Sequence, residues 1–196
     1  MNATLLSPSA GSAFPPPTPL LTAEEFISRF DGQQVELAKG IVEELDMPKS
    51  GLHGKACARM TVQLTLFADK LDCGHVIAND TWIRTVRSPD SVRGPDVFYI
   101  SYTRQPKGTL SDEMIEAIPE LVVEVRSPSD PWSKVLTKTL EYLDSKVTVV
   151  VILDPATKSA IIYRENEAPK TFAPEQDLVV PDILPGFAVN VGSLFA

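Results

Sequence analysis

The chain has 196 residues, 43% of them hydrophobic and 22% charged, a composition typical of one globular domain with its own core. It has two cysteines, no apolar run near the roughly 18 residues of a membrane span, and no basic-apolar signal sequence at its N-terminus. These features argue against a disulfide framework and a membrane partner, and we expect a cytoplasmic protein. The net charge of −8 repels phosphates, so nucleic acid could bind only through local lysines and arginines or bound cations.

The chain begins with a proline-rich stretch. Residues 1–20 contain five prolines and no charged side chain, which predicts a mobile low-complexity leader. We expect residues 21–196 to form a single domain. Its first helix should start at a capping box made by Thr22 and Glu25, and should end near Phe30.

A hairpin is predicted over 34–46, with its turn at Lys39-Gly40. Glu36 lies between Val35 and Leu37, so its side chain projects to the face opposite theirs. A solvated strand face explains this pattern without any function. Glu36 gains a role only if that face borders an acidic site elsewhere in the chain.

An amphipathic helix is predicted from about Leu52 to Asp72. Its apolar face recurs at steps of three and four residues, at Ala56, Met60, Leu64, Phe67 and Leu71. His53 opens this helix, where it could reach a substrate phosphate or bond the backbone. His53, Cys57, Cys73 and His75 are all the histidines and cysteines of the chain, and the first pair has the i, i+4 spacing that can share zinc. A small zinc-binding protein is therefore one alternative.

The middle of the chain predicts strands separated by polar connections. We expect a strand over 76–86, then a turn whose arginines Arg84, Arg87 and Arg93 could bind phosphate or simply be exposed, then a strand over 96–101 that opens with Asp96. The long connection over 102–119 should contain some helix around 112–117.

A carboxylate stands inside the next apolar run. Glu124 interrupts the β-branched strand over 121–125, and burial of an unpaired ion costs several kcal/mol. Glu124 should therefore have a cation, a hydrogen-bonding partner or access to water. Asp96 presents the same problem on another strand, so the two carboxylates could meet at one metal ion.

The strand ends at SPSDP, and Asp130 with Pro131 predicts the start of a helix that runs to about Ser145. This helix should bury a set of apolar residues: Trp132, Val135, Leu136, Leu140 and Leu143. Lys138 lies on another face of this helix. It should be solvated unless the helix lies over Asp96 and Glu124. The apolar strand over 147–153 should lie inside a sheet, and short strands should follow at 160–164, 171–172 and 178–180.

This order of elements predicts an α/β or α+β fold with a central mixed sheet flanked by helices. Two carboxylates on neighbouring strands, with a basic residue beside them, suit magnesium-assisted hydrolysis of a phosphodiester. The hard cation prefers oxygen ligands, and it lowers the pKa of a bound water and stabilises the leaving oxygen.

The segments GPDVFYIS, PELVVEVRSPSDP, KTLEYL, VVVILDP and ILPGFAVNVGSLF resemble the Uma-type family of restriction endonucleases, a branch of the PD-(D/E)XK nuclease superfamily. The resemblance runs in order over residues 21–195. It implies a restriction-endonuclease-like core with extra N-terminal and C-terminal β-hairpins, and Mg²⁺ or Mn²⁺ held by Asp96 and Glu124. It also implies Glu36 as a further acidic residue, His53 at a position where the family has a histidine, and nucleic acid, DNA above all, as substrate.

The chain departs from the superfamily pattern at one position. Lysine is expected two residues after Glu124, where this chain has Arg126, whose strand parity lets it reach the site. Related proteins carry the lysine on the following helix, which points to Lys138. Arginine stays protonated and could stabilise charge without acting as a base. Arg126, His53 and Arg93 are the candidate substrate-binding residues, and Asp96, Glu124, Lys138 and Glu36 the candidate catalytic residues.

Two other readings remain open beside the nuclease. One is a nuclease fold that binds partners without turnover, which the acidic charge and the missing lysine favour; the other is the zinc-binding protein. A homodimer is expected, because cleavage of both strands of a duplex favours an enzyme with two-fold symmetry.

Overall fold

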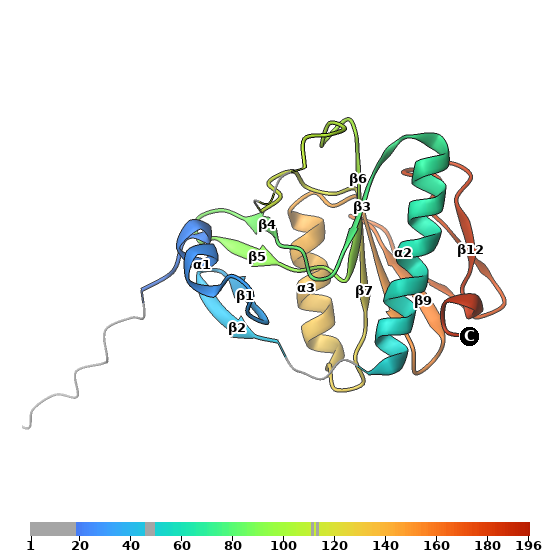
Figure 1. Ribbon diagram of the computed structural model, residues 1–196. Coiled ribbons are helices and arrows are strands. Elements are labelled where there is room, and N and C mark those ends of the chain that lie inside the picture. Colours follow the sequence, from blue (N-terminus) through green and yellow to red (C-terminus); the bar gives the residue numbers. More distant parts are fainter. Residues whose placement is uncertain (1–18, 46–49, 111, 113) are drawn as a thin grey trace, which may run out of the picture.

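The computed structural model describes residues 19–45, 50–110, 112 and 114–196. Its centre is a six-stranded sheet in the order β10-β9-β8-β7-β6-β3 (Figure 1). In that order the strands span Lys170–Phe172, Ser159–Tyr163, Val149–Asp154, Leu121–Val125, Val97–Ser101 and Gly74–Ala78. The predicted leader over 1–20 lies almost entirely outside the described residues, and so does the end of the predicted hairpin at Asp46.

The central sheet is mixed. Strands β7 and β8 are parallel, and every other neighbouring pair in the sheet is antiparallel. Parallel neighbours need a crossover connection, which here is the helix α3 (Trp132–Asp144). This arrangement confirms the predicted mixed sheet with flanking helices.

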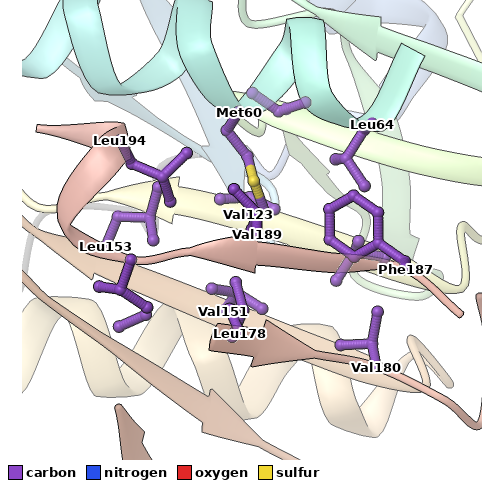
Figure 2. Packing of buried hydrophobic residues seen from close by; sticks show 14 of the residues in the cluster. Met60, Leu64, Val123, Val151, Leu153, Leu178, Val180, Phe187, Val189 and Leu194 are labelled. Atoms are coloured by element: carbon purple, nitrogen blue, oxygen red, sulfur yellow. The ribbon is translucent and has the colours of Figure 1, made fainter. Parts of the chain in front are cut away.

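Helices cover both faces of the sheet. On one face α2 (Gly51–Leu71) packs Met60 and Leu64 against β7 and β8, and on the other α3 packs Tyr142 and Leu143. The C-terminal hairpin of β11 (Asp177–Val179) and β12 (Ala188–Asn190), with the 3₁₀ helix η1 (Gly192–Leu194), completes the first layer. Figure 2 shows the side chains of this layer meeting between α2 and the central strands.

A second sheet of four strands lies beside the first, in the order β2-β1-β5-β4, and carries α1 (Ala23–Phe30) against it (Figure 1). Its strands, in chain order, span Val35–Ala38, Ile41–Glu44, Ile83–Val86 and Ser91–Arg93. The predicted capping box of Thr22 and Glu25 is present at the start of α1. The N-terminal hairpin is thus part of a larger sheet. Strand β5 leads directly into β6, so the two sheets meet just before Asp96.

Two predictions about strands and loops were wrong. The single strand expected over 76–86 is two strands in different sheets, β3 and β4. Around 112–117, the described residues form no helix; Ile115 makes a parallel bridge to Ile83 instead. Both errors arise because pairing with distant strands, which sequence pattern does not reveal, decides the backbone there.

Two predictions about helix faces also need correction. Asp130 does not cap α3: its carboxylate accepts a bond from the Ser127 amide, and the helix starts after Pro131 without a side-chain cap. Leu136 and Leu140 of α3, and Leu71 of α2, are exposed rather than buried. In α3 the buried positions include Thr139 and Tyr142, because the helix turns its polar Lys138 side toward the sheet.

Within the described part of the chain, no helix is both long and apolar enough to cross a membrane.

Candidate active site

Asp96 and Glu124 lie next to each other at the ends of adjacent strands. Strands β6 and β7 pair Val97 with Val123, and the next pair in this antiparallel register is Asp96 with Glu124. The Val125 amide donates a 2.7 Å hydrogen bond to Asp96 Oδ2, which fixes this carboxylate against β7. The sequence pattern therefore identified two carboxylates that the fold does bring together.

Glu36 joins them from the second sheet. It is buried on β1, where Oε1 accepts a 2.9 Å bond from the Gly94 amide and Oε2 accepts a 3.1 Å bond from Arg93. Burial alone raises the pKa of Glu36, but the charges of Lys138 and Arg93 outweigh it and hold the pKa below its ordinary value. Glu36 is therefore an ionised carboxylate, and its strand face is not solvated.

Lys138 bridges two carboxylates. Its Nζ lies 2.8 Å from Glu36 Oε1 and 2.9 Å from Glu124 Oε1, so α3 does lie over the acidic residues. Burial opposes the charge of Lys138, yet Glu124 and Glu36 raise its pKa above the ordinary value. The ammonium group thus stays protonated and supplies a fixed positive charge.

Glu124 is the carboxylate of the site whose ionisation burial opposes most clearly. Burial raises the pKa of Glu124 to about 7. The positive charge of Lys138 opposes this rise, and the negative charges of Asp96 and Glu36 add to it. Its Oε1 also accepts a 2.8 Å hydrogen bond from the Tyr142 hydroxyl, whose own pKa lies well above its usual value because of burial and of Glu124. Negative charge exceeds positive charge around Glu124, a condition that a divalent cation would relieve.

Arg93 is held by carboxylates on three elements. Its guanidinium forms a two-pronged contact with Glu141 of α3 at 2.9 and 2.7 Å, and bonds to Glu36 and to Glu43 of β2. Burial opposes its charge, but these partners raise the pKa of Arg93 above its ordinary value. The arginine ties the second sheet to α3 and lines the pocket at the same time.

Arg126 lies at the edge of the site, one position beyond β7. It makes a 3.5 Å contact with Asp154 and stacks over the Trp132 ring, 5.0 Å from its centroid. Its Nε is buried and has no hydrogen-bond partner among the described residues. Arg126 also lines the pocket, so its guanidinium can meet an acceptor that enters there.

His53 reaches the same centre from α2. Ser50 caps this helix through the His53 amide, and the imidazole Nε2 lies 3.3 Å from Asp96 Oδ2. Its Nδ1 lies 3.5 Å from Cys57 Sγ. The structure thus brings all seven predicted site residues to one region.

The four-residue zinc site does not form. Cys73 and His75 lie beyond the far end of α2, and a 21-residue helix is about 30 Å long. There Cys73 lies against Tyr99, and His75 packs on Tyr102. The alternative of a zinc-binding protein built on four ligands is therefore wrong.

A pocket of about 580 Å³ contains the site. Among the described residues, four basic side chains line it: Arg93, Arg126, Lys134 and Lys138. Seven carboxylates line it as well: Glu36, Glu43, Glu44, Asp80, Asp96, Glu124 and Asp130. This excess of negative charge would repel a phosphate unless cations entered with it.

Two partners of the site were missed from the sequence. Tyr142 and Glu141 follow Lys138 by four and three residues, so α3 presents them on the side that faces the sheet. That spacing was a usable signal for Tyr142. Glu141 reads as half of an ordinary surface Lys-Glu pair until the fold places Arg93 opposite it.

A mixed sheet with a helix on each face, and acidic residues where its adjacent strands end, places the protein in the nuclease-like class of folds. The structure superposes on one described as a "putative nuclease belonging to DUF820" from Anabaena variabilis ATCC 29413 with a TM-score of 0.77. The sequences are 18% identical, and the match covers 89% of this chain and 97% of the other.

The family model described as "Uma2: Putative restriction endonuclease" matches residues 23–192, and the chain belongs to this family. The resemblance drawn from sequence motifs is thereby confirmed. No curated protein matches the chain. The family's description supports a nuclease-type function, with nucleic acid as the substrate and a divalent metal in use.

Proposed function

We propose that this protein is an endonuclease that hydrolyses phosphodiester bonds of DNA with Mg²⁺ or Mn²⁺ held by Asp96 and Glu124. The observation that carries the proposal is the Lys138 ammonium, placed 2.8 Å from Glu36 and 2.9 Å from Glu124 in a pocket that also contains Asp96. Three carboxylates and one fixed cation are the apparatus expected for metal-assisted phosphoryl chemistry.

The donor groups suit a hard divalent cation. Asp96 and Glu124 offer carboxylate oxygens from adjacent strands, and Mg²⁺ and Mn²⁺ prefer such ligands. Burial and neighbouring carboxylates raise the pKa of Glu124, and the same surroundings favour the binding of a cation beside it. When bound, the ion would polarise the scissile phosphate and supply an activated water.

The remaining residues act on the substrate and on the charge that develops. Protonated Lys138 stabilises the extra negative charge of the phosphorane-like transition state, and Glu36 holds Lys138 in place through its 2.8 Å contact. Arg126, which lines the pocket, binds a phosphate oxygen through its guanidinium. His53 orients Asp96, and Arg93 contributes positive charge while it anchors Glu36.

The test is Mn²⁺ titration by calorimetry, comparing wild type with Asp96→Asn and Glu124→Gln, followed by cleavage assays on mixed DNA and RNA substrates in Mg²⁺ or Mn²⁺. We expect one specific site in wild type, strongly weakened binding in both variants, and cleavage of DNA only by wild type. Absence of specific Mn²⁺ binding by folded wild type would overturn the proposal. Cleavage of RNA alone would overturn its substrate.

A second candidate function is a nuclease fold that binds nucleic acid or a partner without turnover. Its supporting observation is the ion pairing of Lys138, which already neutralises part of the charge on Glu36 and Glu124. Under this alternative Mn²⁺ binding occurs, but no substrate is cut, and Lys138→Ala changes nothing measurable in catalysis. For the endonuclease we further propose a homodimer, to be tested by light scattering with and without duplex DNA.

A further inference from the structure

Beside the carboxylate pair lies a thiol, Cys57, that the proposed nuclease reaction does not use. Cys57 follows His53 by one helical turn, and its Sγ lies 3.5 Å from His53 Nδ1. An Asp96 oxygen, an imidazole nitrogen and the Cys57 sulfur all lie within 4.8 Å of one another. Among the described residues, this is the one cluster of three or more such ligands at metal-binding separations.

The distances fit a tetrahedral zinc ion. With zinc-sulfur and zinc-nitrogen bonds of about 2.3 and 2.0 Å, tetrahedral geometry separates the two ligand atoms by about 3.5 Å. The observed separation of Cys57 Sγ and His53 Nδ1 is the same. Asp96, with an oxygen within 4.8 Å of the other two ligand atoms, supplies the third protein ligand once its carboxylate turns from His53 Nε2 toward the ion, and water could take the fourth position.

The surroundings satisfy the other requirements of a metal site. His53 and Asp96 are almost fully buried, with 3% and 6% exposure, so charge inside the cluster is poorly screened and a cation is favoured. The Val125 amide orients Asp96, and the Ser50 hydroxyl fixes the first turn of α2 through the His53 amide. Both His53 and Asp96 line the pocket, which gives an ion a path from solvent.

We propose that His53, Cys57 and Asp96 form a zinc site that shares Asp96 with the hard-metal site, so that bound Zn²⁺ blocks Mg²⁺ or Mn²⁺. A thiolate and an imidazole favour Zn²⁺ over Mg²⁺, whereas oxygen ligands alone favour the reverse. Zinc binding releases the Cys57 thiol proton to the solvent. The zinc site stands on its own geometry, and only its inhibitory effect rests on the proposed function.

The chain offers a matched control for each soft ligand, since it has two cysteines and two histidines. Metal-free wild type, Cys57→Ser and Cys73→Ser are titrated with Co²⁺ as a spectroscopic substitute for zinc. We expect wild type and Cys73→Ser to show the near-ultraviolet thiolate-to-cobalt band and the visible bands of tetrahedral Co²⁺. Cys57→Ser should lack the thiolate band, and its affinity for Zn²⁺ should fall by more than about 100-fold, because outer-shell changes alone cost 10- to 100-fold.

A thiolate band that survives in Cys57→Ser, or that disappears in Cys73→Ser, would overturn the site. If Cys57→Ser does not fold, Cys57→Ala serves as a second variant, because this side chain packs against the apolar core. His53→Gln should weaken Zn²⁺ binding and His75→Gln should not. Equal zinc affinity in these two histidine variants would also contradict the assignment.

The inhibitory effect is read from Mn²⁺ binding by calorimetry with and without one equivalent of Zn²⁺. We expect zinc to weaken Mn²⁺ binding at least tenfold in wild type and to have no effect in Cys57→Ser. Undiminished Mn²⁺ binding by zinc-loaded wild type would show that the sites do not share Asp96. Wild type that binds no Mn²⁺ even without zinc would refute the proposed function, whereas the cobalt spectra decide the zinc site independently.

Discussion

Lys138 is the residue on which turnover should depend most directly. Its Nζ lies between Glu36 and Glu124, where it can stabilise charge on the reacting phosphate. We expect Lys138→Ala to lower the cleavage rate by about 10²- to 10³-fold, the cost of one electrostatic group in a preorganised site. Mn²⁺ binding should persist, because the carboxylates remain and lose a competing cation.

Lys146→Ala is the control for this prediction, since Lys146 is exposed and pairs with Glu165. Cleavage rates at saturating Mn²⁺, measured beside calorimetric Mn²⁺ affinities, separate the two effects. Equal rates for wild type and Lys138→Ala would show that the lysine of α3 has no part in the chemistry.

In the metal-free protein, ionisation of Glu124 should lower the free energy of unfolding at alkaline pH. Burial above all, with Asp96 and Glu36 adding repulsion, raises its pKa from 4.5 to about 7 in the folded protein. Between these two values the unfolded state has lost a proton that the folded state retains, so the free energy of unfolding falls as pH rises. Glu124→Gln removes this loss, and at pH 8 it should be more stable than wild type by on the order of 1 kcal/mol.

Urea unfolding in the presence of a chelator, at pH 5 and at pH 8, measures this difference. At pH 5 both forms carry a neutral group and should differ much less. A Glu124→Gln variant that is destabilised equally at both pH values would contradict the prediction and would assign the main effect to the lost hydrogen bond from Tyr142.

Single residues of the site could be predicted where the sequence contained a local contradiction. Glu124 stood out because it interrupts an apolar strand and Asp96 because it opens one, whereas Lys138 came from the family resemblance. Cys57 and His53 were paired by their helical spacing, but the third member, Asp96, lies 39 positions beyond Cys57. No local pattern connects residues so far apart, since their contact exists only after β6 packs beside the start of α2.

At the scale of elements, Arg93 is a buried anchor that connects strands of the second sheet with α3. It contacts Glu36 of β1, Glu43 of β2 and Glu141 of α3. We expect Arg93→Met to lower the free energy of unfolding by about 3–5 kcal/mol, because it removes the guanidinium that pairs with the largely buried carboxylates of Glu36 and Glu141. Chemical denaturation at pH 7 measures the change.

Arg87→Ala is the matched control, because this arginine pairs with Glu116 on the surface and its side chain is 65% exposed. Exposed pairs contribute up to about 1 kcal/mol. If Arg93→Met proved no more costly than Arg87→Ala, Arg93 would not be the anchor that the geometry indicates.

Most elements could be predicted from periodicity, whereas their partners could not. The strands β6, β7 and β8 follow from apolar runs, and α2 from its spacing of Met60 and Leu64. The division of residues 76–86 into β3 and β4 depends on two different sheets competing for neighbouring segments. Similarly, the face that α3 buries depends on the attraction between Lys138 and two carboxylates. The spacing of apolar residues in the sequence does not indicate this attraction.

At the scale of the whole molecule, a resemblance of motifs was enough to predict the fold class, but not how the second sheet joins the first. That junction places Glu36 and Arg93 at the pocket, because β5 ends at Arg93 and the chain continues through Gly94 to Asp96. The hairpin's Glu36 therefore becomes part of the site through tertiary structure alone. Its strand pattern is equally consistent with an exposed face.

The charge of the molecule predicts that any DNA binding depends on divalent ions. The net charge is −8, and among the described residues carboxylates outnumber basic side chains in the pocket, so phosphate is repelled both at long range and at the site. A bound divalent ion would offset most of this local charge and could bridge protein to phosphate. We therefore expect labelled duplex DNA to bind in Ca²⁺, a hard cation that takes oxygen ligands as Mg²⁺ does, and to bind at least tenfold more weakly in a chelator.

Fluorescence anisotropy at about 0.1 M salt tests this expectation. At this ionic strength the Debye length is roughly 10 Å, so surface charges farther apart than that are largely screened. Asp96→Asn separates the site from a general ionic effect, because it keeps the surface and removes one expected metal ligand. Calcium should strengthen DNA binding by wild type and leave the variant almost unchanged. Equal stimulation of both would mean that calcium acts on the acidic surface as a whole, and the pocket would then not be where DNA is held.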